Sequence, residues 1–125
     1  MAVTYSVQAT VFRSTNFDRE TFRKLGLTSE RAEDEFASSV DLSKIPLPTF
    51  PILIPTAAAT TINFVGIVVT GGMVTIRLTT GNLNFNNIDL PLQGTLLMSG
   101  VELSQIVILG VVSGKPYVEV FGSGS

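Results

Sequence analysis

The alternation of apolar and polar residues is clearest between Met73 and Thr79. One face of this segment is apolar and the other polar, with Val74, Ile76 and Leu78 against Thr75, Arg77 and Thr79. A period of two predicts a β-strand with one buried face. The preceding residues 60–70 are apolar on both faces, which predicts a strand covered on both sides. Gly71-Gly72 lies between the two strands and predicts a tight turn that pairs them as a hairpin.

Short strands separated by turn residues continue along the rest of the chain. Residues 95–99, 105–112 and 117–121 have the apolar, β-branched composition of strands. The asparagine-rich residues 82–89 predict a polar loop or a short strand, and the closing Gly-Ser-Gly-Ser predicts a flexible tail. Regularly spaced short strands with turn signals between them predict a mainly β fold, an antiparallel β-sandwich or jelly roll.

The first part of the chain predicts an N-terminal arm of mixed structure. Residues 3–12 alternate and predict a strand. Residues 17–25 predict a short helix, because Thr15 resembles an N-cap and Gly26 a helix terminator. A second short helix is expected from Thr28 or Ser29 to Ser38, where apolar residues recur at intervals of four.

Four prolines between residues 46 and 55 exclude a helix and a central strand from this segment. The residues between the prolines are mostly apolar, so we expect an extended segment that lies on a hydrophobic surface rather than a free linker. The expected division is therefore an N-terminal arm, residues 1–56, and a β-sandwich domain, residues 57–125.

Charge is distributed unevenly along the 125 residues. Charged residues make up 14% of the chain, below the usual ~25%, and the net charge is −2. Beyond Lys44 the basic residues are Arg77 and Lys115, and the acidic ones are Asp89, Glu102 and Glu119. A β-domain with so few charges leaves large uncharged surfaces, which usually mark contact sites. The sequence thus predicts a homo-oligomer or a subunit of a larger assembly.

The residues expected at this interface come from two segments of the chain: Thr75, Arg77, Thr79, Phe50, Ile52 and Leu53. Arg77 is the residue to examine first, since it lies on an otherwise uncharged strand face. It is expected either to pair with one of the carboxylates Asp89, Glu102 and Glu119 across an interface, or to stand alone in solvent.

The composition removes several classes of chemistry. The chain has no cysteine and no histidine, which excludes thiol nucleophiles, disulfides and the commonest general base and transition-metal ligand. Gly110–Pro116 contains a Gly-Lys pair, but its spacing is not that of a phosphate-binding loop. We therefore expect no catalytic, cofactor-binding or metal-binding residues and no enzyme activity. The acidic pI and the lack of a long apolar run predict neither a nucleic-acid nor a membrane partner.

Residues 57–122 resemble the small structural proteins of tailed-bacteriophage virions. The resemblance lies in TINFVGIVVTGGMVTIRLTTG, the PLQGTLLMSG break and SQIVILGVVSGKPYVEVFG, with threonine-rich strands and glycine turns. It implies a non-enzymatic virion protein made in the host cytoplasm, a homo-oligomer with trimers favoured, that binds the major capsid protein or other virion proteins. A capsid decoration (cement) protein is the first expectation.

Two alternatives stay open. One is a tail, baseplate or fibre subunit of a phage. The other is a carbohydrate-binding β-sandwich that uses the Asn82–Asp89 segment, whose side chains are rich in oxygen and amide groups.

Overall fold

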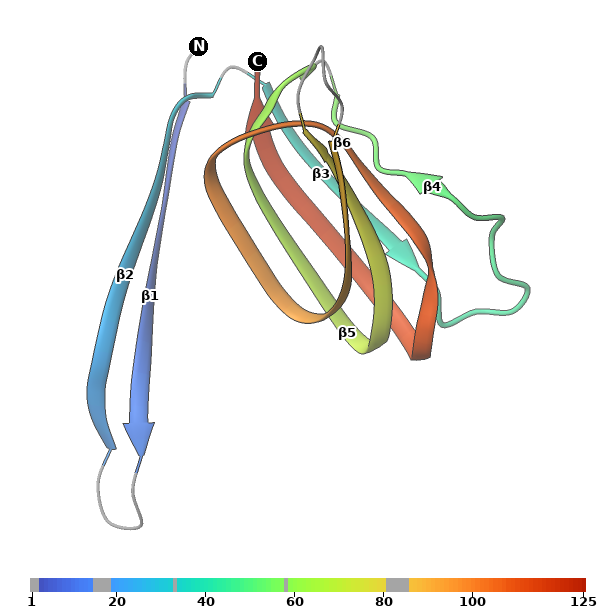
Figure 1. The fold of residues 1–125 in the computed structure, drawn as a ribbon, viewed down its shortest axis with the longest axis horizontal. Coiled ribbons are helices and arrows are strands. Elements are labelled where there is room, and N and C mark those ends of the chain that lie inside the picture. Colours follow the sequence, from blue (N-terminus) through green and yellow to red (C-terminus); the bar gives the residue numbers. More distant parts are fainter. Residues whose placement is uncertain (1–2, 15–18, 33, 58, 81–85) are drawn as a thin grey trace.

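The computed structural model describes residues 3–14, 19–32, 34–57, 59–80 and 86–125. These residues form a mainly β, antiparallel structure without helices (Figure 1). The strands are β1 (Val3–Ser14), β2 (Arg19–Ala32), β3 (Asp34–Asp41), β4 (Ile52–Leu53), β5 (Ile62–Thr80) and β6 (Asn86–Gly124). Within the described part of the chain, no helix has the length and apolar content needed to cross a membrane.

Strands β1 and β2 form a two-stranded ribbon that stands beside the rest of the molecule (Figure 1). Their antiparallel register runs from Val3↔Ala32 to Ser14↔Arg19. The strand predicted for residues 3–12 is confirmed, but the helix predicted for residues 17–25 is wrong from Arg19 onward. Residues 15–18 lie outside the described residues. A helix of nine residues is marginal alone, whereas pairing with β1 hydrogen-bonds the backbone groups on one edge of β2 along its length.

The second predicted helix, from Thr28 or Ser29 to Ser38, is wrong: its residues up to Ala32 belong to β2 and those from Asp34 to β3, and residue 33 lies outside the described residues. Strand β3 pairs antiparallel with β6 from Asp34↔Gly124 to Asp41↔Tyr117. Phe36 is buried and Val40 packs partly against the core, four residues apart. A spacing of four fits one face of a helix, but it is also two periods of a strand. Ser38 between them is only partly exposed, which fits the strand period.

Each half of β5 has a segment of β6 on both of its edges. Residues 62–70 lie between 94–103 and 117–124, and residues 73–80 lie between 86–92 and 103–113. Partner numbers fall as the numbers in β5 rise, so these pairs are antiparallel. Because both edges are occupied, the two halves of β5 do not pair with each other. The hairpin predicted around Gly71-Gly72 is therefore wrong, although the turn exists.

The segments form two groups of four. In the first group the hydrogen-bonded neighbours are, in order, β3, residues 117–124, residues 62–70 and residues 94–99. In the second group they are, in order, β4, residues 103–111, residues 73–80 and residues 86–92. The chain passes between the groups at four glycines with positive φ: Gly71, Gly94, Gly100 and Gly114.

One hydrophobic core joins the two groups. Val65, Ile67 and Val118 of the first group belong to the same buried cluster as Val74, Ile76 and Ile108 of the second. The predicted inward face of residues 73–79 is confirmed, since Val74, Ile76 and Leu78 are at most 3% exposed. The burial of such branched side chains is the main stabilising term in a fold of this kind.

The proline-rich segment lies partly on this core. Strand β4 pairs only with Val107 and Ile108 of β6, so it is an edge strand, as prolines at 51 and 55 require. Ile54 is buried, and Phe50 and Ile52 pack against the core. Ile45 is 90% exposed and Leu47 is 47% exposed. Residues 34–54, expected in the arm, thus contribute strands and core residues to the same body as β5 and β6.

The closing Gly-Ser-Gly-Ser is part of the sheet, so the predicted flexible tail is wrong. Gly122 to Gly124 pair with both β3 and β5, and Ser123 is fully buried. Ser125 exchanges backbone hydrogen bonds with Thr61, at 2.9 and 3.0 Å. A Cβ atom at Gly124 would collide with the carbonyl oxygen of Thr61, so glycine permits this close approach.

The turn at Gly114 provides a test of this architecture. Gly114 has a φ of 72°, and a Cβ atom there would lie 2.5 Å from the carbonyl oxygen of Gly71. We expect Gly114→Ala to lower the free energy of unfolding by about 1–3 kcal/mol, measured by urea denaturation. Gly94→Ala, with positive φ but open space, should cost about 1 kcal/mol.

Gly110→Ala is the matched control, because its site is open and its φ is not positive. It should change the free energy of unfolding by no more than about 0.5 kcal/mol. Equal losses for Gly110→Ala and Gly114→Ala would contradict the close packing of the two turns.

Candidate functional site around Arg77

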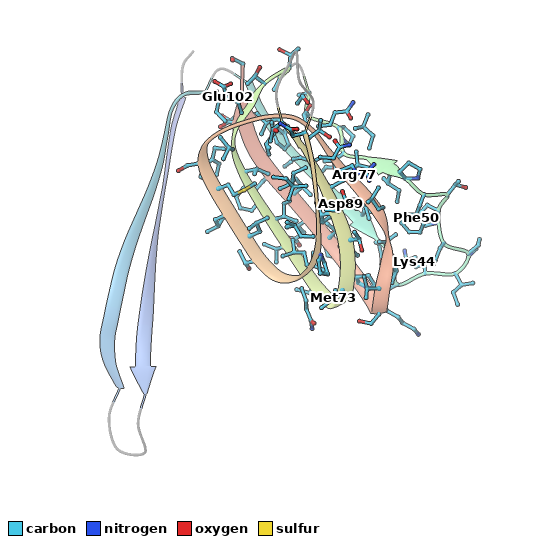
Figure 2. All side chains as sticks on the ribbon, viewed as in Figure 1. Lys44, Phe50, Met73, Arg77, Asp89 and Glu102 are labelled. Carbon is cyan, nitrogen blue, oxygen red and sulfur yellow. The ribbon has the colours of Figure 1, made fainter. Side chains whose placement is uncertain are left out.

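The polar face of residues 73–80 carries an ion pair at its centre. Arg77 and Asp89 are directly opposite each other on neighbouring antiparallel segments. Arg77 Nε donates to Asp89 Oδ1 at 2.7 Å, and Nη2 donates to Oδ2 at 2.9 Å. A two-point contact between a guanidinium and a carboxylate fixes both side chains in one plane. Figure 2 shows the two labelled residues side by side.

Of the three carboxylates that the sequence offered as partners of Arg77, the structure pairs Asp89 with it. Asp89 pairs with Arg77 inside one chain, rather than across an interface, and Arg77 is not a lone solvated residue. Hydrogen bonds from Arg77 hold the pKa of Asp89 below its usual value. The side chains remain 38% and 41% exposed, so the pair is solvent-screened and contributes more to orientation than to stability.

A second polar pair lies next to the first. Thr79 Oγ1 donates to Asn87 Oδ1 at 2.8 Å, again between directly opposed residues. Ser104 Oγ donates to the carbonyl oxygen of Thr79 at 3.3 Å. These bonds explain why Thr79, predicted to face outward, is only 7% exposed.

Together these groups border a surface hollow of about 500 Å³. Its polar lining consists of Arg77, Thr79, Asn87, Ser104 and Gln105, and its apolar lining of Pro51, Val107 and Leu109. We call this surface, with Asp89, the Arg77 face. Among the described residues, the amide groups of Gln105 and the Asn87 nitrogen form no hydrogen bond within the chain, so they are available to a ligand in the hollow.

The six predicted interface residues do not all share this face. Thr75, Arg77 and Thr79 alternate with the buried residues of the same segment. Leu53, which is 57% exposed, pairs with Val107, and Val107 pairs with Arg77. Phe50 and Ile52 instead pack against the core of their own chain. Whether any of these residues contacts a partner remains a prediction.

Several residues of the Arg77 face escaped the sequence analysis. Asn87 belongs to the Asn82–Asp89 segment that was considered for carbohydrate binding, of which residues 82–85 lie outside the described residues. Pro51 was expected only as part of an extended segment, and Ser104 and Gln105 carried no functional signal. One feature of the sequence could have indicated this face. Asn87 and Asp89 are two residues apart, as are Arg77 and Thr79, so the two pairs can lie opposite each other on neighbouring strands. Strand pairing between these segments brings the polar residues together in register.

No protein-family model matches the chain, and no curated protein is significantly similar to it.

The Arg77–Asp89 pair predicts a specific dependence of stability on pH. Because folding lowers the pKa of Asp89 from its ordinary value of 3.8, the pair stabilises the fold fully at pH values above that pKa. This contribution disappears as the pH falls through the lowered pKa. Asp89→Asn should therefore be slightly less stable than the wild type at neutral pH and equally stable in strong acid. Urea denaturation across this pH range measures the difference.

Glu102→Gln is the control, since Glu102 is exposed and forms no ion pair within the described residues. If the stability difference between Asp89→Asn and the wild type persisted unchanged in strong acid, the difference would not come from the Arg77–Asp89 ion pair.

Proposed function

We propose that this chain is a non-enzymatic structural subunit of a virus particle, a capsid decoration protein that associates with copies of itself, favouring trimers, and with neighbouring capsid subunits. The observation that carries the proposal is the order of the paired segments. Numbered along the chain from β3, the eight segments follow the orders 1-8-3-6 and 2-7-4-5. This is the order expected of a jelly roll, an architecture used by viral capsid proteins and by lectins.

In this proposal the two groups are the two sheets of a jelly roll, packed face to face. The single core that contains residues of both groups supports such packing. A fold does not determine a function, so the step to a virion protein rests on further features. One is the scarcity of charge on the strands from residue 57 onward.

The β1–β2 ribbon is the second supporting feature. Its strands of 12 and 14 residues extend away from the body (Figure 1). At about 3.4 Å per residue, 14 residues span roughly 48 Å, enough to reach over a neighbouring subunit. An isolated two-stranded ribbon is marginally stable in water, so contact with a neighbour would stabilise it.

The proposal predicts that the purified chain self-associates at micromolar concentration, as measured by light scattering coupled to size-exclusion chromatography. Virus particles from the cells that produce the chain should contain it in many copies, detected by mass spectrometry. Antibody labelling in the electron microscope should place it on the capsid; labelling of the tail would favour a tail, baseplate or fibre subunit instead. A strictly monomeric chain that is absent from particles would contradict the proposal.

The hollow on the Arg77 face favours carbohydrate binding as a second candidate function. Its volume of about 500 Å³ and its amide and guanidinium groups suit a small saccharide, which is bound through hydrogen bonds to such groups. In that case a glycan array should show binding that Asn87→Ala and Gln105→Ala each reduce at least about tenfold. Ser39→Ala, on the first group of strands, is the matched control and should bind normally. An array without reproducible binding would exclude this candidate.

A further inference from the structure

A second surface of the body combines exposed aromatic and acidic side chains. It lies on β3 and the adjacent end of β6, where alternate residues point away from the core. We call it the acidic β3–β6 face, defined by Glu35, Ala37, Asp41, Tyr117, Glu119 and Phe121. Tyr117 and Phe121 are each 37% exposed.

The acidic β3–β6 face is hollowed between its two strands. A depression of about 350 Å³ is bordered by Ala37 and Ser39 on one strand and by Tyr117, Glu119 and Phe121 on the other. The ring of Phe121 also lies over Gly66 of β5, where a Cβ atom would collide with it. The aromatic side chain is thereby held in place at the edge of the depression, and the surface is preformed.

Most carboxylates on the acidic β3–β6 face have no basic side chain paired with them in the part of the chain whose side chains are described. Among residues 35–57, 59–80 and 86–125, the ion pairs are Arg77–Asp89 and Lys44–Asp41, the latter at a distance of 3.9 Å. Glu35 and Glu119 therefore have no basic partner among these residues. From residue 34 onward the sequence has three basic and six acidic residues, so the body is net negative.

The β1–β2 ribbon has the opposite charge. Its outer half, residues 10–14 of β1 and 19–24 of β2, contains the basic residues Arg13, Arg19, Arg23 and Lys24 and the acidic residue Glu20. The same two segments contain apolar Val11, Phe12 and Phe22. It therefore combines net positive charge with apolar groups, which complements a surface that combines carboxylates with aromatic rings.

We infer that the outer half of the β1–β2 ribbon of one copy docks on the acidic β3–β6 face of a second copy. The end of β1 at Ser14 and the start of β2 at Arg19 lie away from the body (Figure 1), where a neighbouring copy can receive them. The inference rests on the proposed function, because it names the contact through which copies of the chain associate. Charge attraction guides the ribbon to the face, and the apolar groups close the contact.

Reciprocal charge reversal in the full chain tests the inference. Arg23→Glu with Lys24→Glu makes the ribbon acidic, and Glu35→Lys with Glu119→Lys makes the face basic. Each double variant alone should associate at least about tenfold more weakly than the wild type, measured by analytical ultracentrifugation. Mixed in equal amounts, they should associate with each other, because the ribbon of each variant meets a face of opposite charge on the other. A closed ring of three would still contain one contact between like variants, so the recovery is measured as formation of mixed complexes.

Glu102→Lys is the matched control, since it reverses an exposed charge outside both surfaces. It should leave association unchanged, and circular dichroism should show that all variants retain β structure. Raised salt should weaken the association of the wild type, as expected when exposed charges are screened.

The outcomes separate this inference from the proposed function. If the wild type self-associates but the reversals have no effect, or the mixture does not recover association, the ribbon does not dock on this face while the proposed function stands. If Glu102→Lys weakens association equally, the effect is one of net charge and the inference is wrong. If the wild type stays monomeric and is absent from particles, both proposals fall.

Discussion

The body depends on β5 having a segment of β6 on each edge. Backbone N–H and C=O groups inside a protein must be hydrogen-bonded, and a strand paired on both edges meets this demand completely. Both halves of β5 are paired in this way. Their apolar side chains can then be buried without stranding backbone groups, which explains why residues 62–69 tolerate apolar residues on both faces. Everything else is attached to these two central strands.

Four glycine crossings accompany this pairing. Residues 62–70 are paired on both edges by segments of β6, so the next segment, residues 73–80, lies in the other group. Gly71, Gly94, Gly100 and Gly114 adopt positive φ where the chain passes from one group to the other. Residues 73–80 and 86–92 stay in one group and pair with each other, and the crossings elsewhere surround one core with residues from the whole of 36–120.

The sequence allowed the strands after residue 60 to be located, together with the inward face of Val74, Ile76 and Leu78. Which strands pair could not be predicted from the sequence. Gly71-Gly72 is compatible with a hairpin between paired strands and also with a turn that leads from one group of strands to the other. The helix predicted up to Ser38 failed because spacings of four fit both periods. Asp89 could be named as a possible partner of Arg77, but the choice among three carboxylates depends on register between segments 12 residues apart. The Gly-Ser-Gly-Ser end was misjudged because small residues suit close backbone approach as well as flexibility.

The position of residues 117–124 bears on the order of events during synthesis. This segment fills the space between β3 and residues 62–70, yet it follows both of them in the chain. Until the ribosome has released it, β3 and the apolar residues 62–70 each have an open edge, and such edges invite pairing with other chains. The long sequence separation between partners also slows folding. The last strand to be synthesised is thus the one that closes the open edges of two strands made before it.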